Sequence, residues 1–187
     1  DCTVKGLGPD AYCRHPKFVP YMVSLHGDGF DYVGPTQDAP WCSIPADVNF
    51  VAHNAAFDST VFEAAQRMGY IPSDLIPTWD CTANLAVYIQ CPRNLKGFAE
   101  QMLGVKPDKT VRDNMKGKLP ADLDAAEHKA LLEYARYDSV YCHELWNTYE
   151  KHWPYHERIL ARHTMTSGQR GIYIDKPKLD AGVEVLY

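Results

Sequence analysis

The feature that most constrains the fold is a short apolar run at residues 48–52, VNFVA. Its β-branched and aromatic members indicate a strand buried on both faces of a sheet. From Thr60 onward apolar residues recur at helical spacing, Thr60-x-x-Glu63 matches a capping box, and Gly69 ends the pattern. The sequence therefore predicts an α/β chain in which residues 53–58 form a strand-to-helix turn.

Other segments have patterns of their own. Residues 18–33 alternate short apolar runs around a His-Gly-Asp-Gly turn, which predicts an antiparallel hairpin. Helical spacing predicts helices at residues 80–88, 95–103 and 123–150, and a further helix after Pro154.

Composition limits the class of protein. The chain has 187 residues, of which 45% are hydrophobic, so we expect one domain with a substantial core and a short appendage. The formal charge of −5 argues against a general binder of nucleic acid or anionic membranes. No run of about 18 apolar residues and no signal-type N-terminus is present, so we expect a cytoplasmic protein that does not enter a membrane.

Three further features of the chain bear on its class. The six cysteines include no Cys-x-x-Cys pair, which predicts reduced thiols rather than a zinc site or a disulfide framework. Residues 93–118 hold seven Lys and Arg against three acidic residues, a net of +4; composition favours a solvated loop, and a phosphate-facing loop is the alternative. Because the chain starts with Asp1 and ends inside a helical pattern, we expect a fragment.

A carboxylate interrupts the apolar stripe of the long helix. Leu131, Tyr134, Asp138, Tyr141 and Leu145 recur at spacings of three and four. A buried carboxylate needs a cation, hydrogen-bond donors or a metal ion, although Asp in mid-helix is more often exposed to solvent. Tyr134 lies one turn before Asp138, where its hydroxyl can reach a water near that carboxylate; the alternative is a core aromatic.

A second carboxylate, Asp58, follows the predicted strand at 48–52, where open α/β sheets place their ligand crevice. Its alternative role is the N-cap of the helix at Thr60. Asn54 can serve as a turn residue and Phe57 as a hydrophobic staple.

Together, Asn54-Ala-Ala-Phe57-Asp58 and Tyr134-Ala-Arg-Tyr-Asp138 resemble the second and third motifs of the DEDD 3′–5′ exonuclease family, tyrosine subtype. Glu133 stands where the histidine subtype needs His. The segment GQRGIYIDKPKLD resembles the entry into the polymerase part of DNA-polymerase-I-like (family A) enzymes, and DAYCRHPKF resembles phage-type members.

The resemblance implies a ribonuclease-H-like exonuclease fold, a mixed sheet flanked by helices. Residues 1–152 would form the exonuclease domain, and residues 153–187 would begin the connector to the polymerase domain of the same chain. The implied function is proofreading: hydrolysis of the 3′-terminal phosphodiester bond of single-stranded DNA, in the host cytoplasm if the source is a phage.

The same resemblance implies the roles of the site residues. Asp58 and Asp138 would be catalytic ligands of two Mg²⁺ or Mn²⁺ ions, which prefer oxygen donors. Tyr134 would orient the attacking water. Asn54 and Phe57 would form the substrate-binding turn, with Asn54 near the 3′ sugar or phosphate and Phe57 packing that turn.

This chain departs from the family pattern in one motif. The first motif, Asp-x-Glu, is absent, because Asp1-Cys2-Thr3 has Thr where Glu belongs. We therefore expect the central first strand to be missing and this fragment to be catalytically impaired. The alternative functions are a nucleic-acid-binding fragment of the same fold without hydrolysis and, third, a Cys/His metal module, whose ligand spacing is not found.

Overall fold

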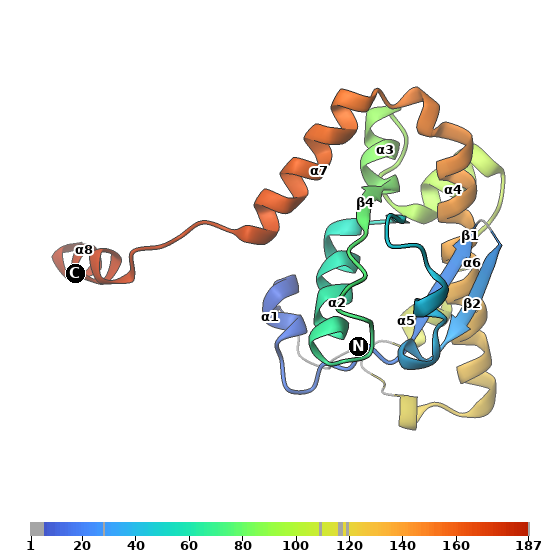
Figure 1. The fold of residues 1–187 in the computed structure, drawn as a ribbon, viewed down its shortest axis with the longest axis horizontal. Helices are drawn as coiled ribbons and strands as arrows, with labels where there is room; N and C mark the ends of the chain where they lie inside the picture. The colour runs from blue at the N-terminus through green and yellow to red at the C-terminus, as the bar shows by residue number, and fades with distance from the viewer. Residues whose placement is uncertain (1–5, 28, 109, 116–117, 119, 187) are drawn as a thin grey trace.

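The computed structural model describes residues 6–27, 29–108, 110–115, 118 and 120–186. The described chain is a mixed α/β structure, mostly helical, with two small two-stranded sheets (Figure 1). The strands are β1 Val23–Gly27, β2 Phe30–Gly34, β3 Asn49–Ala52 and β4 Thr78–Cys81. The α-helices are α1 Pro9–Cys13, α2 Ala55–Arg67, α3 Thr82–Tyr88, α4 Leu95–Leu103, α5 Thr110–Met115, α6 Ala125–Tyr149, α7 Tyr155–Arg170 and α8 Lys176–Leu186.

The first sheet is the predicted hairpin. β1 and β2 pair antiparallel with Val23 opposite Gly34 and Leu25 opposite Tyr32. Gly27 and Gly29 have φ angles of 139° and 91°, which favour glycine, and a Cβ on Gly27 would lie 3.0 Å from the His143 ring of α6. The hairpin prediction is therefore confirmed, and its turn lies tightly against α6.

The second sheet differs from two of the predictions. β3 pairs parallel with β4, but Asn49 is exposed and the rest of β3 is only half-buried, so the prediction of a strand buried on both faces is wrong. In the described part of the chain β3 pairs with β4 alone, so no described strand pairs with its other edge. Asp80 lies in β4 and helix α3 begins at Thr82, so the predicted helix start at residue 80 is also wrong.

Helix α2 begins earlier than predicted. Asn54 adopts the left-handed conformation, φ 84° and ψ 48°, and the chain turns into a helix at Ala55. Asn tolerates this conformation better than most residues because its short polar side chain fits there. Thr60 therefore lies inside the helix and donates to the Ala56 carbonyl, so the predicted capping box at Thr60 is wrong. Asp58 lies in the first turn of α2 and is not an N-cap.

The main core lies between α3, α4 and α6. Leu85, Phe98 and Leu145 are fully buried there, with Trp146 and Trp153 beside them. The prediction of α4 is confirmed at both ends: the Asn94 side chain accepts from Gly97 N, and Gly104 has a left-handed φ of 69°. The prediction of the long helix is also confirmed, with a capping box of Asp124 and Glu127 at its start.

Helix α6 contacts both sheets. Ser139 Oγ lies 2.7 Å from Ser24 Oγ of β1, and Cys142 Sγ donates to the Val51 carbonyl of β3 at 3.7 Å. The facing residues on α6 are only three positions apart, so β1 and β3 lie along neighbouring turns of one helix. No strand among the described residues pairs with both of them.

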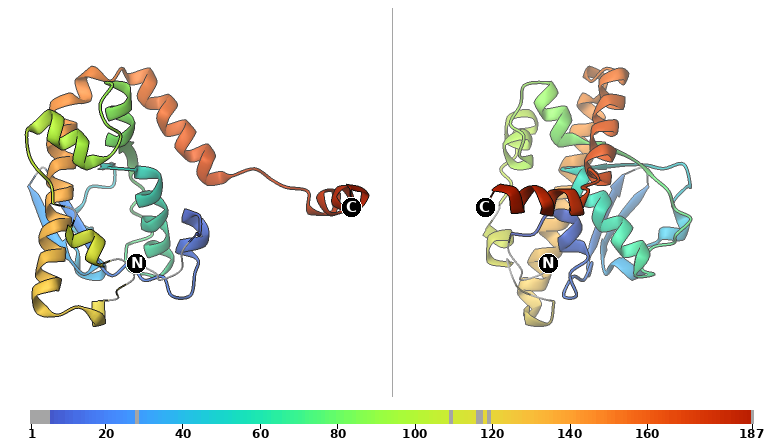
Figure 2. Two further views of the ribbon diagram at one scale, coloured as in Figure 1. Left: turned by 180° about the vertical axis from the view of Figure 1, so that it is seen from behind. Right: turned by 90° about the vertical axis from the view of Figure 1, so that its left-hand side faces the viewer.

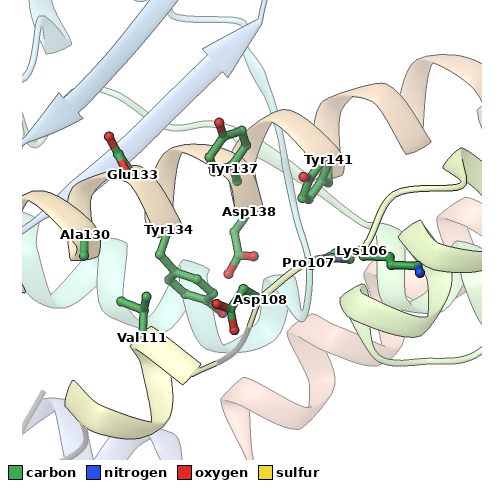
Figure 3. Close-up of a pocket in the computed structure, with 10 residues that line it drawn as sticks. All are labelled: Lys106, Pro107, Asp108, Val111, Ala130, Glu133, Tyr134, Tyr137, Asp138 and Tyr141. Atoms are coloured by element: carbon green, nitrogen blue, oxygen red, sulfur yellow. The ribbon is translucent and has the colours of Figure 1, made fainter.

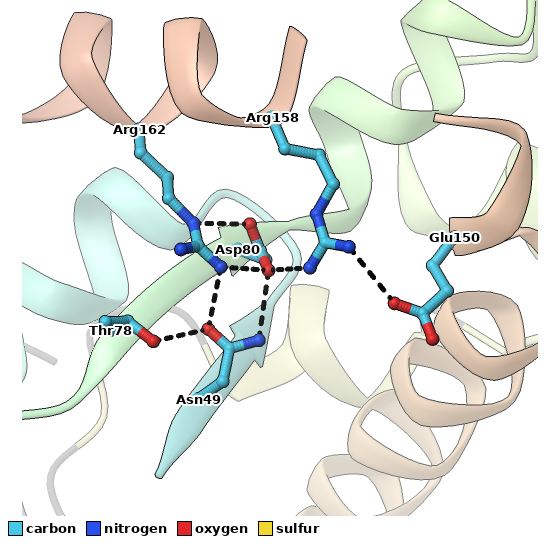
Figure 4. A network of polar contacts seen from close by, with 6 residues as sticks. All are labelled: Asn49, Thr78, Asp80, Glu150, Arg158 and Arg162. Atoms are coloured by element: carbon cyan, nitrogen blue, oxygen red, sulfur yellow. Dashed lines mark hydrogen bonds and ion pairs between the residues drawn. The ribbon is translucent and has the colours of Figure 1, made fainter. Parts of the chain in front are cut away.

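Helix α7 packs on the domain through polar groups. Arg158 and Arg162 bind Asp80 of β4, whose side chain is 1% exposed (Figure 4). At the other end of α7, Gln169 Nε2 donates to Ser59 Oγ at 2.6 Å and to the Ala56 carbonyl at 3.2 Å in α2.

Beyond Gly171 the chain leaves the rest of the structure and ends in α8 (Figure 2). Its apolar side chains are open to solvent: Ile172 is 92% exposed and Tyr173 90%. Among the helices that the structure describes, none is both long and apolar enough to span a membrane.

Candidate functional site

Asp58 and Asp138, the carboxylates of the two motifs, both affect the pKa of one buried thiol, that of Cys142. Cys142 lies one turn after Asp138 on α6 and is buried against Thr82. Burial is the main cause that raises the pKa of Cys142 to about 12, and the negative charges of Asp58 and Asp138 both add to this. Coulomb energy falls with distance, so both carboxylates lie in the neighbourhood of this thiol although 80 residues separate them in the chain.

Asp58 is in an unfavourable place for a charge. It is half-buried in the first turn of α2, and burial raises its pKa to about 7, partly opposed by a backbone hydrogen bond. It forms no ion pair with any described residue. At neutral pH Asp58 is therefore divided between its protonated and charged forms, and a cation beside it would favour the charged form.

Asp138 and Tyr134 line a pocket of about 280 Å³ between α6 and the segment that leads into α5 (Figure 3). Tyr134 and Asp138 point to the same side of α6, toward Asp108. The other lining residues are Lys106, Pro107, Val111, Ala130, Glu133, Tyr137 and Tyr141. Asp58, Asn54 and Phe57 do not line this pocket.

The turn before α2 holds the two predicted substrate-binding residues. Asn54 is exposed, and its side chain makes no cap hydrogen bond to α2. Phe57 is half-buried against Tyr12 of α1, with ring centroids 5.9 Å apart. Phe57 thus packs the turn, while Asn54 is open to a ligand from solvent.

Asp108, which no sequence pattern assigned to the site, faces Tyr134 and Asp138 across the pocket (Figure 3). Hydrogen bonds from the backbone and side chain of Thr110 hold the pKa of Asp108 below its usual value. The pattern Asp108-x-Thr110 before a helix is a local turn signal that could have indicated this placement.

Part of the basic segment is neutralised by ion pairs. Lys96 pairs with Glu100, and Lys118 pairs with Glu127. Lys106 remains at the pocket. Lys109 and Lys116 lie outside the described residues, as do Asp1, Cys2 and Thr3, the positions compared with the first motif.

The oxygen donors of Asp58 and Asp138 are of the kind that binds a hard divalent cation, but two carboxylates are too few ligands for one. Asp58 and Asp138 offer carboxylate oxygens, which Mg²⁺ and Mn²⁺ prefer. The nearby Cys142 thiol, with its pKa near 12, stays protonated and does not favour zinc. Within the described ranges no three His, Cys, Asp or Glu side chains come close enough together to hold a metal ion, so these two carboxylates would need further oxygen ligands.

Comparisons with known proteins give no relative for this arrangement. No model of a known protein family, no curated protein and no solved structure matches this chain.

Proposed function

We propose that this chain belongs to a 3′–5′ exonuclease that removes nucleotides from the 3′ end of single-stranded DNA, as the proofreading part of a DNA polymerase. The observation that carries the proposal is that Asp58 and Asp138, the carboxylates of two separate motifs, both raise the pKa of the Cys142 thiol, which supports their lying near one another. Tyr134 lies on the same side of α6 as Asp138, as the tyrosine-type motif requires.

The residues divide the work of phosphodiester hydrolysis. Asp58 and Asp138 would hold Mg²⁺ or Mn²⁺, which when bound activates water and neutralises charge on the leaving oxygen. The Tyr134 hydroxyl would orient the attacking water beside Asp138. Asn54, exposed at the turn before α2, would contact the sugar or phosphate at the 3′ end, and Phe57 would keep that turn in place.

The sheets support a ribonuclease-H-like arrangement that includes one more strand. β1 and β3 each have an edge unpaired within the described residues, and both lie on neighbouring turns of α6. Unpaired backbone groups need partners. A strand between β1 and β3 would join the two sheets into one mixed sheet, and an Asp-x-Glu sequence on it would supply the missing oxygen ligands near Asp138.

The C-terminal segment supports a connector to a polymerase domain. Residues 172–174 carry three large apolar side chains that are 64% to 92% exposed, and such surface usually packs against another part of a protein. In a complete polymerase, this segment would lie between the exonuclease and polymerase domains.

The test compares residues 1–187 with a chain extended upstream by about 20 residues, enough for one strand and its loop. The substrate is single-stranded DNA labelled at the 5′ end, with Mg²⁺, and a control strand carries a phosphorothioate at its last linkage. We expect stepwise shortening from the 3′ end by the extended chain only, and loss of that activity in its Asp138→Ala variant. Equal activity of the extended wild type and Asp138→Ala would refute the assignment.

A second function, nucleic-acid binding without hydrolysis, is favoured by one observation: the described residues hold no group of three metal-binding side chains. In that case both chains would bind single-stranded DNA and neither would shorten it, with or without Mg²⁺.

A further inference from the structure

Two tyrosines of α6, one exposed and one half-buried, line the pocket side by side. Tyr137 and Tyr141 are one turn apart on α6, their ring centroids are 5.9 Å apart and their planes differ by 21°. Tyr137 is 57% exposed, and both rings line the pocket that Tyr134 and Asp138 also line (Figure 3). We call Tyr137 and Tyr141 the tyrosine pair.

The charges around the pocket restrict what can bind there. Among the described residues, Asp108, Glu133 and Asp138 line it together with one cation, Lys106. Three carboxylates against one cation make the described lining a poor site for a free phosphate. A flat, neutral group fits better, provided that it offers an aromatic face to the tyrosine pair and N–H donors to the carboxylates.

We propose that the tyrosine pair binds a nucleobase of the single-stranded DNA by stacking, an inference that rests on the proposed function. Every base has an aromatic face, and the exocyclic amino groups of adenine, cytosine and guanine can donate to carboxylates. A volume of about 280 Å³ suits one base rather than several. With its base here, the strand would run past Asp138, and Lys106 at the pocket would face its phosphates.

The test measures binding without hydrolysis, in EDTA, on the chain of residues 1–187. The probe is a 5′-labelled oligodeoxyadenylate, compared with a strand of the same backbone whose last two positions are abasic. Stacking on one aromatic side chain contributes about 5- to 150-fold in affinity. We expect wild type to bind the abasic strand at least about 5-fold more weakly, and Tyr137→Ala and Tyr141→Ala to bind both strands equally.

Two variants serve as controls. Tyr137→Phe keeps the ring and should keep the preference for the strand with bases. Tyr155→Ala removes a 73% exposed tyrosine of α7, away from the pocket, and should also leave the preference unchanged. Equal binding of both strands by wild type, or the same preference in Tyr137→Ala as in wild type, would overturn the proposal.

Two other outcomes separate this proposal from its alternatives. Base-dependent binding without any hydrolysis by the extended chain would reject the nuclease and keep the stacking site. If wild type binds both strands equally and choline displaces neither strand's backbone contacts but itself binds at the tyrosine pair, the pocket is a site for organic cations. That result would overturn the nucleobase proposal.

Discussion

Replacing Asp58 with Asn should stabilise this protein at neutral and alkaline pH. The folded protein raises the pKa of Asp58 from 3.8 to about 7, so the folded state binds the proton more tightly than the unfolded state does. The stability that the protonated carboxyl contributes is complete below pH 3.8 and is lost as the pH rises through about 7. At about 1.4 kcal/mol per pKa unit, the full loss amounts to up to about 4 kcal/mol. Asn has the same shape and cannot ionise, so the variant should not show this loss.

The assay is urea unfolding followed by tryptophan fluorescence at pH 5, 6, 7 and 8. The difference in free energy of unfolding between Asp58→Asn and wild type should grow in favour of the variant across this range. Asp47→Asn, at an exposed site, should stay within about 0.5 kcal/mol of wild type at every pH. A constant difference between Asp58→Asn and wild type would refute the reasoning, because Asp58 would then be charged throughout. In the extended chain, Mg²⁺ should stabilise wild type at pH 8 and leave the Asp58→Asn variant unchanged.

Three further perturbations test other parts of the structure. Burial alone would raise the pKa of Asp80, but hydrogen bonds from Arg162, Arg158 and Asn49 lower it overall, so its contribution is present above pH 3.8 and is lost as the pH falls further. Asp80→Asn should therefore cost about 3 kcal/mol in urea unfolding at pH 7 and much less near pH 2. Phe98→Ala should cost about 3 to 5 kcal/mol, because the ring is fully buried, and an unfolding midpoint equal to that of wild type would contradict the core described above. In the extended chain, Tyr134→Phe should slow nucleotide release by roughly 10 to 1000-fold while Asp138→Ala abolishes it; the reverse order would exclude a metal-binding role for Asp138.

Local signals explain which elements could be predicted. The hairpin turn has glycines at the positions that need positive φ, and α4 has Asn94 at its start and Gly104 at its end, so both elements follow from residues close together in the chain. Helical spacing predicts a helix at Asp80, but Asp80 lies in β4, which pairs with β3, and its carboxylate accepts from Arg158, 78 residues away. The early start of α2 depends on the left-handed conformation of one residue, Asn54. The spacing of apolar residues does not indicate that conformation.

In the candidate site, too, local spacing predicts some of the placements and long-range packing determines the others. Tyr134 and Asp138 are four residues apart on one helix, so their common side of α6 follows from helical geometry. The approach of Asp58 to the same helix depends on how α2 packs, and only the family resemblance suggested it. The places of Asp108 and the tyrosine pair at the pocket depend on how the segment before α5 packs against α6. No spacing of residues in the sequence indicates that packing.

The attachment of α7 at two separate places determines the direction in which the chain leaves the domain. Arg158 binds β4 and Gln169 binds α2, and at 1.5 Å per residue these contacts are about 16 Å apart along the helix. One contact would allow α7 to pivot, whereas two fix its axis. The chain beyond Gly171 therefore starts from a defined point with a defined heading, and a force applied there would act as a lever on the first turn of α2, where Asp58 lies.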